Sequence, residues 1–328
     1  MSRIPSSIAV IFLFAIASCI GVFVPGARAA NYPDKPIRVM VVYPPGGGID
    51  ILARPLGQRL TDTWGVPLVI DNRPGAGTTI ASGIVAKAAP DDYTLLMSDV
   101  SFVIVPSLYT HLSYDPVRAF TPVSLLNSVT DMLVVYPSLP VNSVKELIEF
   151  AKANPRKILY ASAGNGTPPH LAAELFKAAT GVDMIHVPYK GAVPALVDVL
   201  AGQCQLWIGA LASPLPYVRA GRLPALAVTG KARSNLLPNV PTMAEAGLPD
   251  YDVSSWYALL APAGTPRSIV EKISQEAGRA VQTPVIKQQL ASDGAEAIGS
   301  SPQEFALFLK NELSKWGKAV KLAGAKLD

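Results

Sequence analysis

The 328-residue sequence has few residues of the types that anchor metals and cofactors. It contains two cysteines and three histidines, and the histidines, His111, His170 and His186, are widely spaced. A structural zinc site needs several Cys or His ligands at short, regular spacing, and no such run is present. We therefore expect neither a metal nor a cofactor.

Motifs of the common nucleotide-binding and hydrolytic enzymes are also absent. The sequence has no G-x-x-x-x-G-K-[ST] phosphate loop, no G-x-S-x-G elbow and no H-E-x-x-H run. The glycine run Gly46-Gly47-Gly48 does not have the G-x-G-x-x-G spacing of a dinucleotide site. Together with the export signal and the two-domain cleft that are described below, these absences favour a binding protein over an enzyme. Dispersed catalytic groups leave no motif, so an exported hydrolase or isomerase of small carboxylates with a dispersed acid–base pair stays an alternative.

Residues 1–29 have the pattern of a cleavable secretory signal peptide. Arg3 precedes an apolar run over residues 8–24, and the small-x-small triplet Ala27-Arg28-Ala29 follows it. A cleavage-like flank of this kind favours removal after export over a membrane-spanning helix. The sequence that ends at Cys19 also resembles a lipoprotein box, so a lipid anchor there is an alternative. We predict a periplasmic protein.

A strong charge of one sign is missing from the mature chain. Removal of residues 1–29 takes away Arg3 and Arg28 and no acid, which leaves 26 Lys and Arg against 24 Asp and Glu. This balance does not favour nucleic acid or an anionic membrane as a partner. Cys204 is then the only thiol, so no intrachain disulfide can form. About 300 residues exceed the usual size of a single hydrophobic core, which favours two domains.

Short apolar runs alternate with amphipathic stretches through most of the mature chain, which predicts an α/β fold with parallel strands and helices on both faces. In the first series we expect strands at 37–43, 68–70 and 94–97 and helices at 49–63 and 78–88. In the second series we expect strands at 157–162, 184–187, 205–208 and 223–228 and helices at 168–180 and 192–201.

Two extended passages, at 120–136 and 253–260, break this alternation. Because no clear helix interrupts them, they are expected to carry the chain from one domain to another. This predicts a discontinuous domain one, residues 30–130 and 254–328, and an inserted domain two, residues 131–253. Two domains joined in this way enclose a hinged cleft.

Small-residue turns link strands to helices at 44–50, 73–78, 163–170 and 188–192. The first N–H groups of a helix have no intrahelical acceptor, and the helix dipole adds positive character there. Glycine lets a ligand approach that backbone, and ligands of open α/β sheets bind at the carboxyl ends of strands. A tight turn uses glycine without any ligand as well. The recurrence of the pattern in both series predicts an anion held between two such turns.

Several polar residues mark the expected starts of helices. Asp50 is expected to accept hydrogen bonds from amides at a helix start, and Thr167 is expected to act as the N-cap of the helix predicted at 168–180. Ser143 and Ser301 each stand three residues before a glutamate, which predicts two helices that begin with capping boxes. A further helix is expected to start at Thr265-Pro266.

Seven segments, taken in order, resemble the Bug receptors, which are the solute-binding proteins of tripartite tricarboxylate transporters. The resemblance covers essentially the whole mature chain. The segments are 43–50, 72–77, 164–171, 187–191, 226–229, 241–247 and 260–266.

The resemblance implies a type II periplasmic binding-protein fold and a monomeric receptor that performs no catalysis. Such a receptor holds a small organic carboxylate, a di- or tricarboxylate or an aromatic acid, and delivers it to membrane permease subunits. A receptor that signals to a sensor kinase stays an alternative. The match, together with the turn at 188–191, gives the expected ligand-binding residues Pro45, Gly46, Gly47, Asp50, Ser98, Gly164, Gly166, Thr167, His170 and Tyr189.

One departure from the family concerns the residues after the strand at 205–208. Many relatives have Asp-Asn there, and the acid can meet an amino group of the ligand. This chain has Gly209-Ala210. The departure predicts a ligand without an amino group.

Overall fold

The computed structural model describes residues 32–91, 93–230, 232–251 and 253–323. The predicted signal peptide and Cys19 lie outside these residues. Residues 33–328 form one compact unit, to which the description below refers. Among the described helices, none has the length and the apolar character that crossing a membrane requires.

The strands of the described residues pair in the order β2-β1-β3-β9-β4-β7-β5-β6, and β8 and β10 pair with β4. Their bounds are Ile37–Val41 (β1), Leu68–Asn72 (β2), Thr94–Asp99 (β3), Phe120–Val135 (β4), Leu159–Ser162 (β5), Ile185–Pro188 (β6), Leu206–Ala210 (β7), Ala225–Val228 (β8), Ser254–Pro262 (β9) and Ala295–Ala297 (β10).

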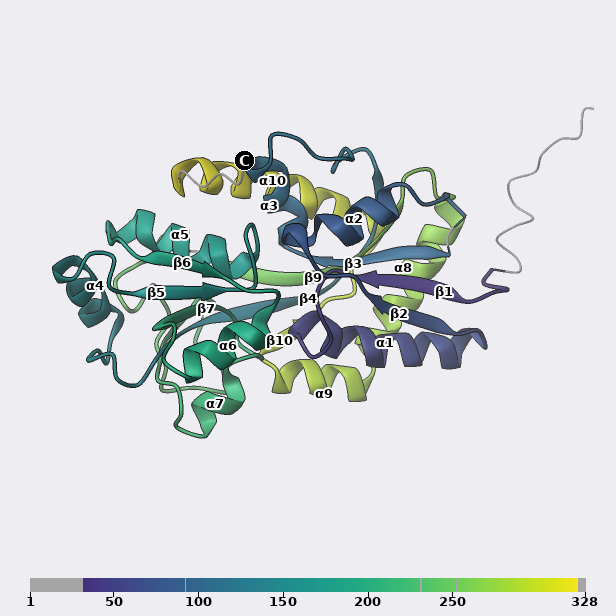
Figure 1. Ribbon diagram of the computed structural model, residues 1–328. Coiled ribbons are helices and arrows are strands. Elements are labelled where there is room, and N and C mark those ends of the chain that lie inside the picture. Colours follow the sequence, from purple (N-terminus) through teal and green to yellow (C-terminus); the bar gives the residue numbers. More distant parts are fainter. Residues whose placement is uncertain (1–31, 92, 231, 252, 324–328) are drawn as a thin grey trace, which may run out of the picture. The chain divides into compact units, whose positions relative to one another are not determined.

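Helices cover both faces of these strands (Figure 1), so the predicted α/β class is confirmed. Their bounds are Gly48–Trp64 (α1), Thr79–Ala86 (α2), Ser101–Leu108 (α3), Val144–Ala153 (α4), Pro168–Thr180 (α5), Ala192–Leu200 (α6), Leu215–Arg219 (α7), Arg267–Val281 (α8), Pro284–Ser292 (α9) and Pro302–Ala323 (α10). A short 3-10 turn, Ala76–Thr78, precedes α2.

The parallel strands form two groups. The first strand group is β1, β2 and β3, and the second strand group is β5, β6 and β7. The long strands β4 and β9 run between them and pair antiparallel (Figure 1). β4 pairs with β9 up to Thr130 and with β7 from Asp131 onward. The predicted extended passages are thus β4 and β9, and the division into two domains near residues 130 and 253 stays a prediction.

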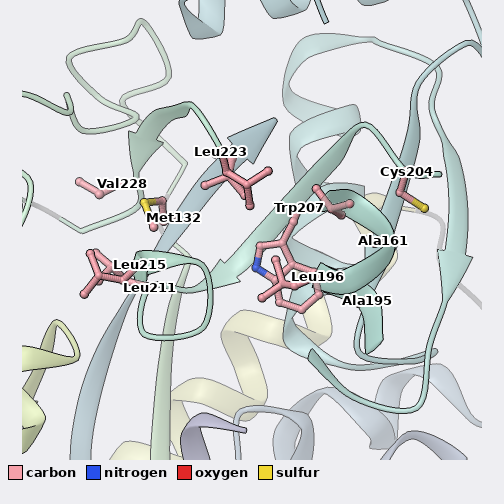
Figure 2. Close-up of a cluster of buried hydrophobic side chains, with 12 residues drawn as sticks. Met132, Ala161, Ala195, Leu196, Cys204, Trp207, Leu211, Leu215, Leu223 and Val228 are labelled. Atoms are coloured by element: carbon pink, nitrogen blue, oxygen red, sulfur yellow. The ribbon is translucent and has the colours of Figure 1, made fainter. Parts of the chain in front are cut away.

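Continuous apolar runs form the centre of the sheet because helices bury both of its faces. The run from Met132 to Val135 on β4 is completely buried. On β7, Trp207 packs in a cluster with Ala195 and Leu196 of α6, which Figure 2 shows. Cys204, the one cysteine of the described residues, is buried in the same cluster, so its thiol is shielded.

The two predicted serine caps are confirmed, with one change of partner in the capping boxes. Ser301 Oγ accepts the N–H of Glu304, and Glu304 Oε2 accepts the N–H of Ser301 at 2.8 Å. Ser143 Oγ likewise accepts the N–H of Glu146 at 3.1 Å. The Glu146 carboxylate accepts the N–H of Asn142 instead of that of Ser143.

Four elements have no counterpart in the predictions: α3, α7, α9 and β10. The sequence of α3, Ser-Phe-Val-Ile-Val-Pro-Ser-Leu, is apolar apart from its two serines, contains Pro106, and has six of its eight residues buried. A short, mostly buried helix shows little amphipathic period, so hydrophobic spacing does not reveal it.

Candidate ligand-binding site

A cavity of about 60 Å³ lies where turns of the two strand groups meet. A space of this size holds several water molecules or part of a small solute. Its walls are the turn after β1 with the start of α1, the end of β3, the turn after β5, the start of α6, the end of β7, and β9. These are largely carboxyl ends of parallel strands, where α/β proteins bind ligands.

The first wall is the turn that begins α1. Pro45 and Gly47 line the cavity, together with Gly48 and Ile49. Gly47 is the N-cap of α1, so the amides that follow it belong to the group that a helix leaves without an intrahelical acceptor. Gly46 does not line the cavity; its φ of +86° makes the bend that turns the chain into the helix. This wall offers N–H groups and a positive helix end to an anion.

Asp50 holds this turn in shape instead of lining the cavity. Its carboxylate is 97 % shielded and accepts the N–H of Gly46 at 3.0 Å, the Arg54 guanidinium at 2.8 Å and the Asn72 amide at 3.0 Å. Burial raises the pKa of Asp50, but the hydrogen bonds from Arg54, Gly46 and Asn72 outweigh it and lower the pKa overall. The expectation that Asp50 bonds amides at the helix start is confirmed.

The opposite wall is the start of α6. Gly191, Ala192 and Val193 line the cavity at the N-terminus of this helix. A Cβ atom on Gly191 would lie 3.1 Å from Pro44 Cδ, so glycine allows the two walls to touch. Tyr189 lies just before this wall and does not line the cavity; its hydroxyl donates to Asp198 at 2.6 Å.

The turn after β5 uses its own polar groups internally. Gly164 donates its N–H to Ser162 Oγ at 3.1 Å, and Gly166 donates its N–H to His170 Nδ1 at 3.1 Å. Ala163, with Pro168 and Pro169, is the part of this turn and helix that lines the cavity. The predicted residues Gly164, Gly166 and His170 therefore shape the wall from behind.

The predicted hydroxyl cap at Thr167 is wrong, although Thr167 does occupy the N-cap position. Its Oγ1 donates to the carbonyl of Gly164 at 2.6 Å. Pro169 has no N–H, so the N–H of His170 is the one usual partner left for a capping oxygen, and the Thr167 hydroxyl bonds the Gly164 carbonyl instead.

His170 belongs to a stack of rings under this turn. The His170 and His186 rings stack with centroids 4.1 Å apart, and Tyr160 stacks on His186 at 4.9 Å. Burial lowers the pKa of His170 to about 4, so the ring is neutral near pH 7 and Nδ1 can accept the Gly166 N–H.

The floor of the cavity is polar and acidic. Asp99, at the end of β3, lines it with Ser255 and Tyr257 of β9. Asp99 is 4 % exposed and accepts the N–H of Ser101 at 3.0 Å, and burial raises the pKa of Asp99 to about 6. The predicted residue Ser98 is adjacent, fully buried and outside the lining, and its hydroxyl has no partner among the described residues. Within the described chain, no group of three or more His, Cys, Asp or Glu is placed to hold a metal ion.

Several residues of the cavity were not predicted from the sequence: Tyr43, Asp99, Gly191, Trp207 and Tyr257. For two of them, the sequence has a feature that could have indicated a place in the binding site. Asp99 follows Ser98 at the end of a predicted strand, and Gly191 stands in one of the four small-residue turns. Tyr257 lies on the predicted extended passage at 253–260, where packing in the core was the default expectation and lining of the cleft the alternative. Trp207 had no such signal, because aromatic residues on strands pack in cores by default.

The fold, together with this cavity, is that of a binding protein. The sequence profile described as "Tripartite tricarboxylate transporter family receptor" matches residues 52–325, and the chain belongs to this family. Protein BugT of Bordetella pertussis is 36 % identical over 320 residues, which are 95 % of this chain and 98 % of BugT.

Solved structures agree with the sequence relatives. Rpa4515 of R. palustris with adipate has a TM-score of 0.87 and 38 % identity, with 90 % of this chain and 100 % of that chain covered. MatC of Rhodopseudomonas palustris with bound malate has a TM-score of 0.84 and 31 % identity, with coverages of 88 % and 100 %. The family and its structural neighbours are periplasmic binding proteins, and the resemblance to the Bug receptors is confirmed.

Proposed function

We propose that this protein is a periplasmic receptor that captures a small organic carboxylate in the cavity and delivers it to the permease subunits of a tripartite transporter. The observation that carries the proposal is that the N-termini of α1 and α6 line the same small cavity. Each charge-assisted hydrogen bond from such an amide contributes about 1.5–3 kcal/mol. The adipate and malate in the two similar structures support the ligand class.

The proposed motion is closure of two domains about β4 and β9. The turns of the first strand group touch those of the second at two glycines. A Cβ atom on Gly77 would lie 2.5 Å from the carbonyl oxygen of Asn165, and one on Gly191 would meet Pro44. Contacts this close are expected where two walls separate and rejoin around a ligand.

Within this proposal the expected site residues have two roles. Pro45 and Gly47 face the ligand. The others hold the walls from behind: Gly46, Asp50, Ser98, Gly164, Gly166, Thr167, His170 and Tyr189.

Binding without catalysis is part of the proposal. A general base must reach the proton it removes and have a pKa near the working pH. His170 and His186 lie outside the lining of the cavity, and burial lowers their pKa values to about 4 and about 3. The two histidines are therefore not placed to act as general bases, and membership of the receptor family is what supports a receptor over a hydrolase or isomerase.

A ligand screen tests the proposal directly. The mature protein is heated with adipate, malate, citrate or benzoate, and the unfolding temperature is compared with that of the free protein. A ligand at 100 times its Kd adds about 2.7 kcal/mol of stability. If sugars or peptides raise the unfolding temperature and no carboxylate does, the proposed ligand class is wrong.

The variant Gly47→Val tests whether the first wall of the cavity, the turn that begins α1, contributes to ligand binding. Gly47 has a φ of −80° and a ψ of 165°, a conformation open to any residue, and its Cβ would have open space apart from Pro44 O at 3.8 Å. We expect a loss of affinity of at least about tenfold, which corresponds to 1.4 kcal/mol, with unchanged stability. Calorimetric titration measures the affinity, and urea unfolding measures the stability. Unchanged affinity would remove this turn from the site.

A further inference from the structure

The indole of Trp207 has a buried N–H group without a partner. Trp207 lies on β7, is 1 % exposed and lines the cavity. Its Nε1 has no hydrogen-bond acceptor among the described residues. Buried polar groups are nearly always hydrogen-bonded, because an unsatisfied donor costs free energy. We therefore expect the acceptor of this N–H group to come from solvent or from a bound ligand.

Packing fixes where the N–H edge of the indole lies. The ring packs against α6 in the buried cluster that Figure 2 shows. Its N–H edge leans over Gly209, because a Cβ atom at position 209 would lie 3.0 Å from Cε2, the ring atom bonded to Nε1, and 2.9 Å from Cζ2. The same Cβ atom would lie 2.9 Å from Cγ of Pro169. Pro169 and Ala210, the residue after Gly209, both line the cavity, so this edge of the indole lies at the cavity wall.

The part of the lining that belongs to the second strand group is almost entirely apolar. It consists of glycine, alanine, valine and proline, apart from Trp207 and Ser213, and none of its described side chains is charged. An indole N–H group donates a hydrogen bond and cannot accept one, whereas a serine hydroxyl can do both. An ammonium group has no acceptor atom and cannot satisfy Trp207. This wall therefore fits an alkyl chain that carries an oxygen acceptor.

We propose that Trp207 is a specificity-determining residue of this receptor and that its indole N–H group donates a hydrogen bond to a second oxygen-bearing group of the bound carboxylate. This role rests on the proposed function and names the part of the ligand that the site selects. One carboxylate of the ligand binds the amides at the starts of α1 and α6, and its methylene groups lie on the apolar wall. A carboxylate, amide or hydroxyl oxygen at the other end accepts from Trp207. A ligand that ends in a methyl or an ammonium group leaves this donor unsatisfied.

Gly209 is the second member of this arrangement. A strand residue with a side chain at this position would push the indole edge away from the wall, and only glycine leaves the space that the edge occupies. The prediction of a ligand without an amino group thus has a second reason. Position 209 carries no acid, and the indole that covers it supplies a donor alone.

Ligands that differ at one end only test the proposal on the unmodified mature protein. Titration calorimetry compares adipate with hexanoate, with the monoamide of adipic acid and with 6-aminohexanoate. The same comparison is made with the shorter glutarate and succinate series, and the series that binds most tightly is used. We expect the diacid and its monoamide each to bind ten or more times more tightly than the monoacid, because both present an acceptor oxygen. The amino acid of the series should bind no more tightly than the monoacid, and binding as tight as that of the diacid would overturn the proposal.

Trp207→Phe removes the N–H group and keeps an aromatic ring on β7. It should lower the affinity for the diacid more than that for the monoacid, so that the preference falls below about threefold. Gly209→Ala should reduce the preference in the same direction, because its methyl group displaces the N–H edge. Trp64→Phe is the matched control at the last residue of α1, outside the lining, and it should keep the full preference. A folded Trp207→Phe protein that keeps the full preference overturns the proposal.

The hydrogen bond itself can be observed by nuclear magnetic resonance of isotope-labelled indole groups. The chain has four tryptophans, and the signal of Trp207 is the one that disappears in Trp207→Phe. We expect its N–H resonance to move downfield with the diacid and clearly less with the monoacid. Equal shifts would contradict a hydrogen bond to the second oxygen-bearing group. If Trp207→Phe does not fold, the comparison of the monoamide with the monoacid decides the matter on the unmodified protein.

The outcomes separate this role from the proposed function. Monoacids that bind as tightly as their diacids overturn the role of Trp207 and leave the receptor function standing. Failure of every carboxylate to bind overturns the receptor function itself.

Discussion

Sequence similarity suggests that Asp50 contacts the ligand, but in the structure its carboxylate holds the backbone of the first turn instead. Its oxygens accept hydrogen bonds from Gly46, Arg54 and Asn72, which tie the first turn to α1 and to β2. His170 does the same for the turn after β5 through the N–H of Gly166. Single side chains thus fix the two turns whose neighbours line the cavity.

Asp50→Asn should lower the free energy of unfolding by about 1.5–3 kcal/mol at pH 7, because it weakens hydrogen bonds to a charged acceptor. The pKa of Asp50 is lowered in the folded protein, so its stabilisation is present above the unfolded value of 3.8 and is lost as pH falls below it. Urea unfolding from pH 7 to pH 3 measures both effects. An equal loss of stability in acid and at neutral pH would contradict the role of the charge.

The folded protein should lose stability between pH 6.5 and pH 4 through His170. Its pKa falls from 6.5 to about 4 on folding, so the unfolded chain binds the proton more strongly in this window. One pKa unit corresponds to 1.36 kcal/mol, so the loss amounts to roughly 2–3 kcal/mol. His170→Asn keeps an acceptor for the Gly166 N–H and cannot take up the proton. Its unfolding free energy should depend less on pH than that of the unmodified protein, and equal pH profiles would refute this.

At the scale of elements, glycines at positive φ determine how closely the turns approach. Gly77 has a φ of +59° and lies against the backbone of Asn165, which belongs to the turn after β5. Backbone oxygen cannot move aside as a flexible side chain can. A side chain here therefore separates the two turns.

Gly77→Ala should weaken ligand binding about tenfold or more by keeping these turns apart. Gly221→Ala is the matched control, because Gly221 has a similar φ of +68° and a Cβ there would meet no atom within 4 Å. In both variants an alanine must adopt a left-handed backbone conformation, which costs about 1 kcal/mol. Only Gly77→Ala also brings its Cβ atom too close to the carbonyl oxygen of Asn165. Titration calorimetry of both proteins checks this; an equal effect of the two substitutions would mean that the contact with Asn165 plays no part in binding.

Across the whole molecule, alternation of strands and helices predicted most elements, while the site was predicted only in part. α5 was predicted with its observed bounds because it is amphipathic and begins with proline. The acid in the lining of the cavity was not predicted, since Asp99 comes beside Tyr257 only through the pairing of β3 with β9. The sequence also does not show which turn has free amides: the donors of Gly164 and Gly166 are used internally, whereas the start of α6 lines the cavity.

A crystal structure of the mature chain with the tightest-binding carboxylate of the screen tests the central claim most directly. We predict carboxylate oxygens within hydrogen-bonding distance of the N–H groups at the start of α1, Gly48 or Ile49, and at the start of α6, Ala192 or Val193. A carboxylate bound elsewhere, for example in the groove beside Trp316 on α10, would contradict the account.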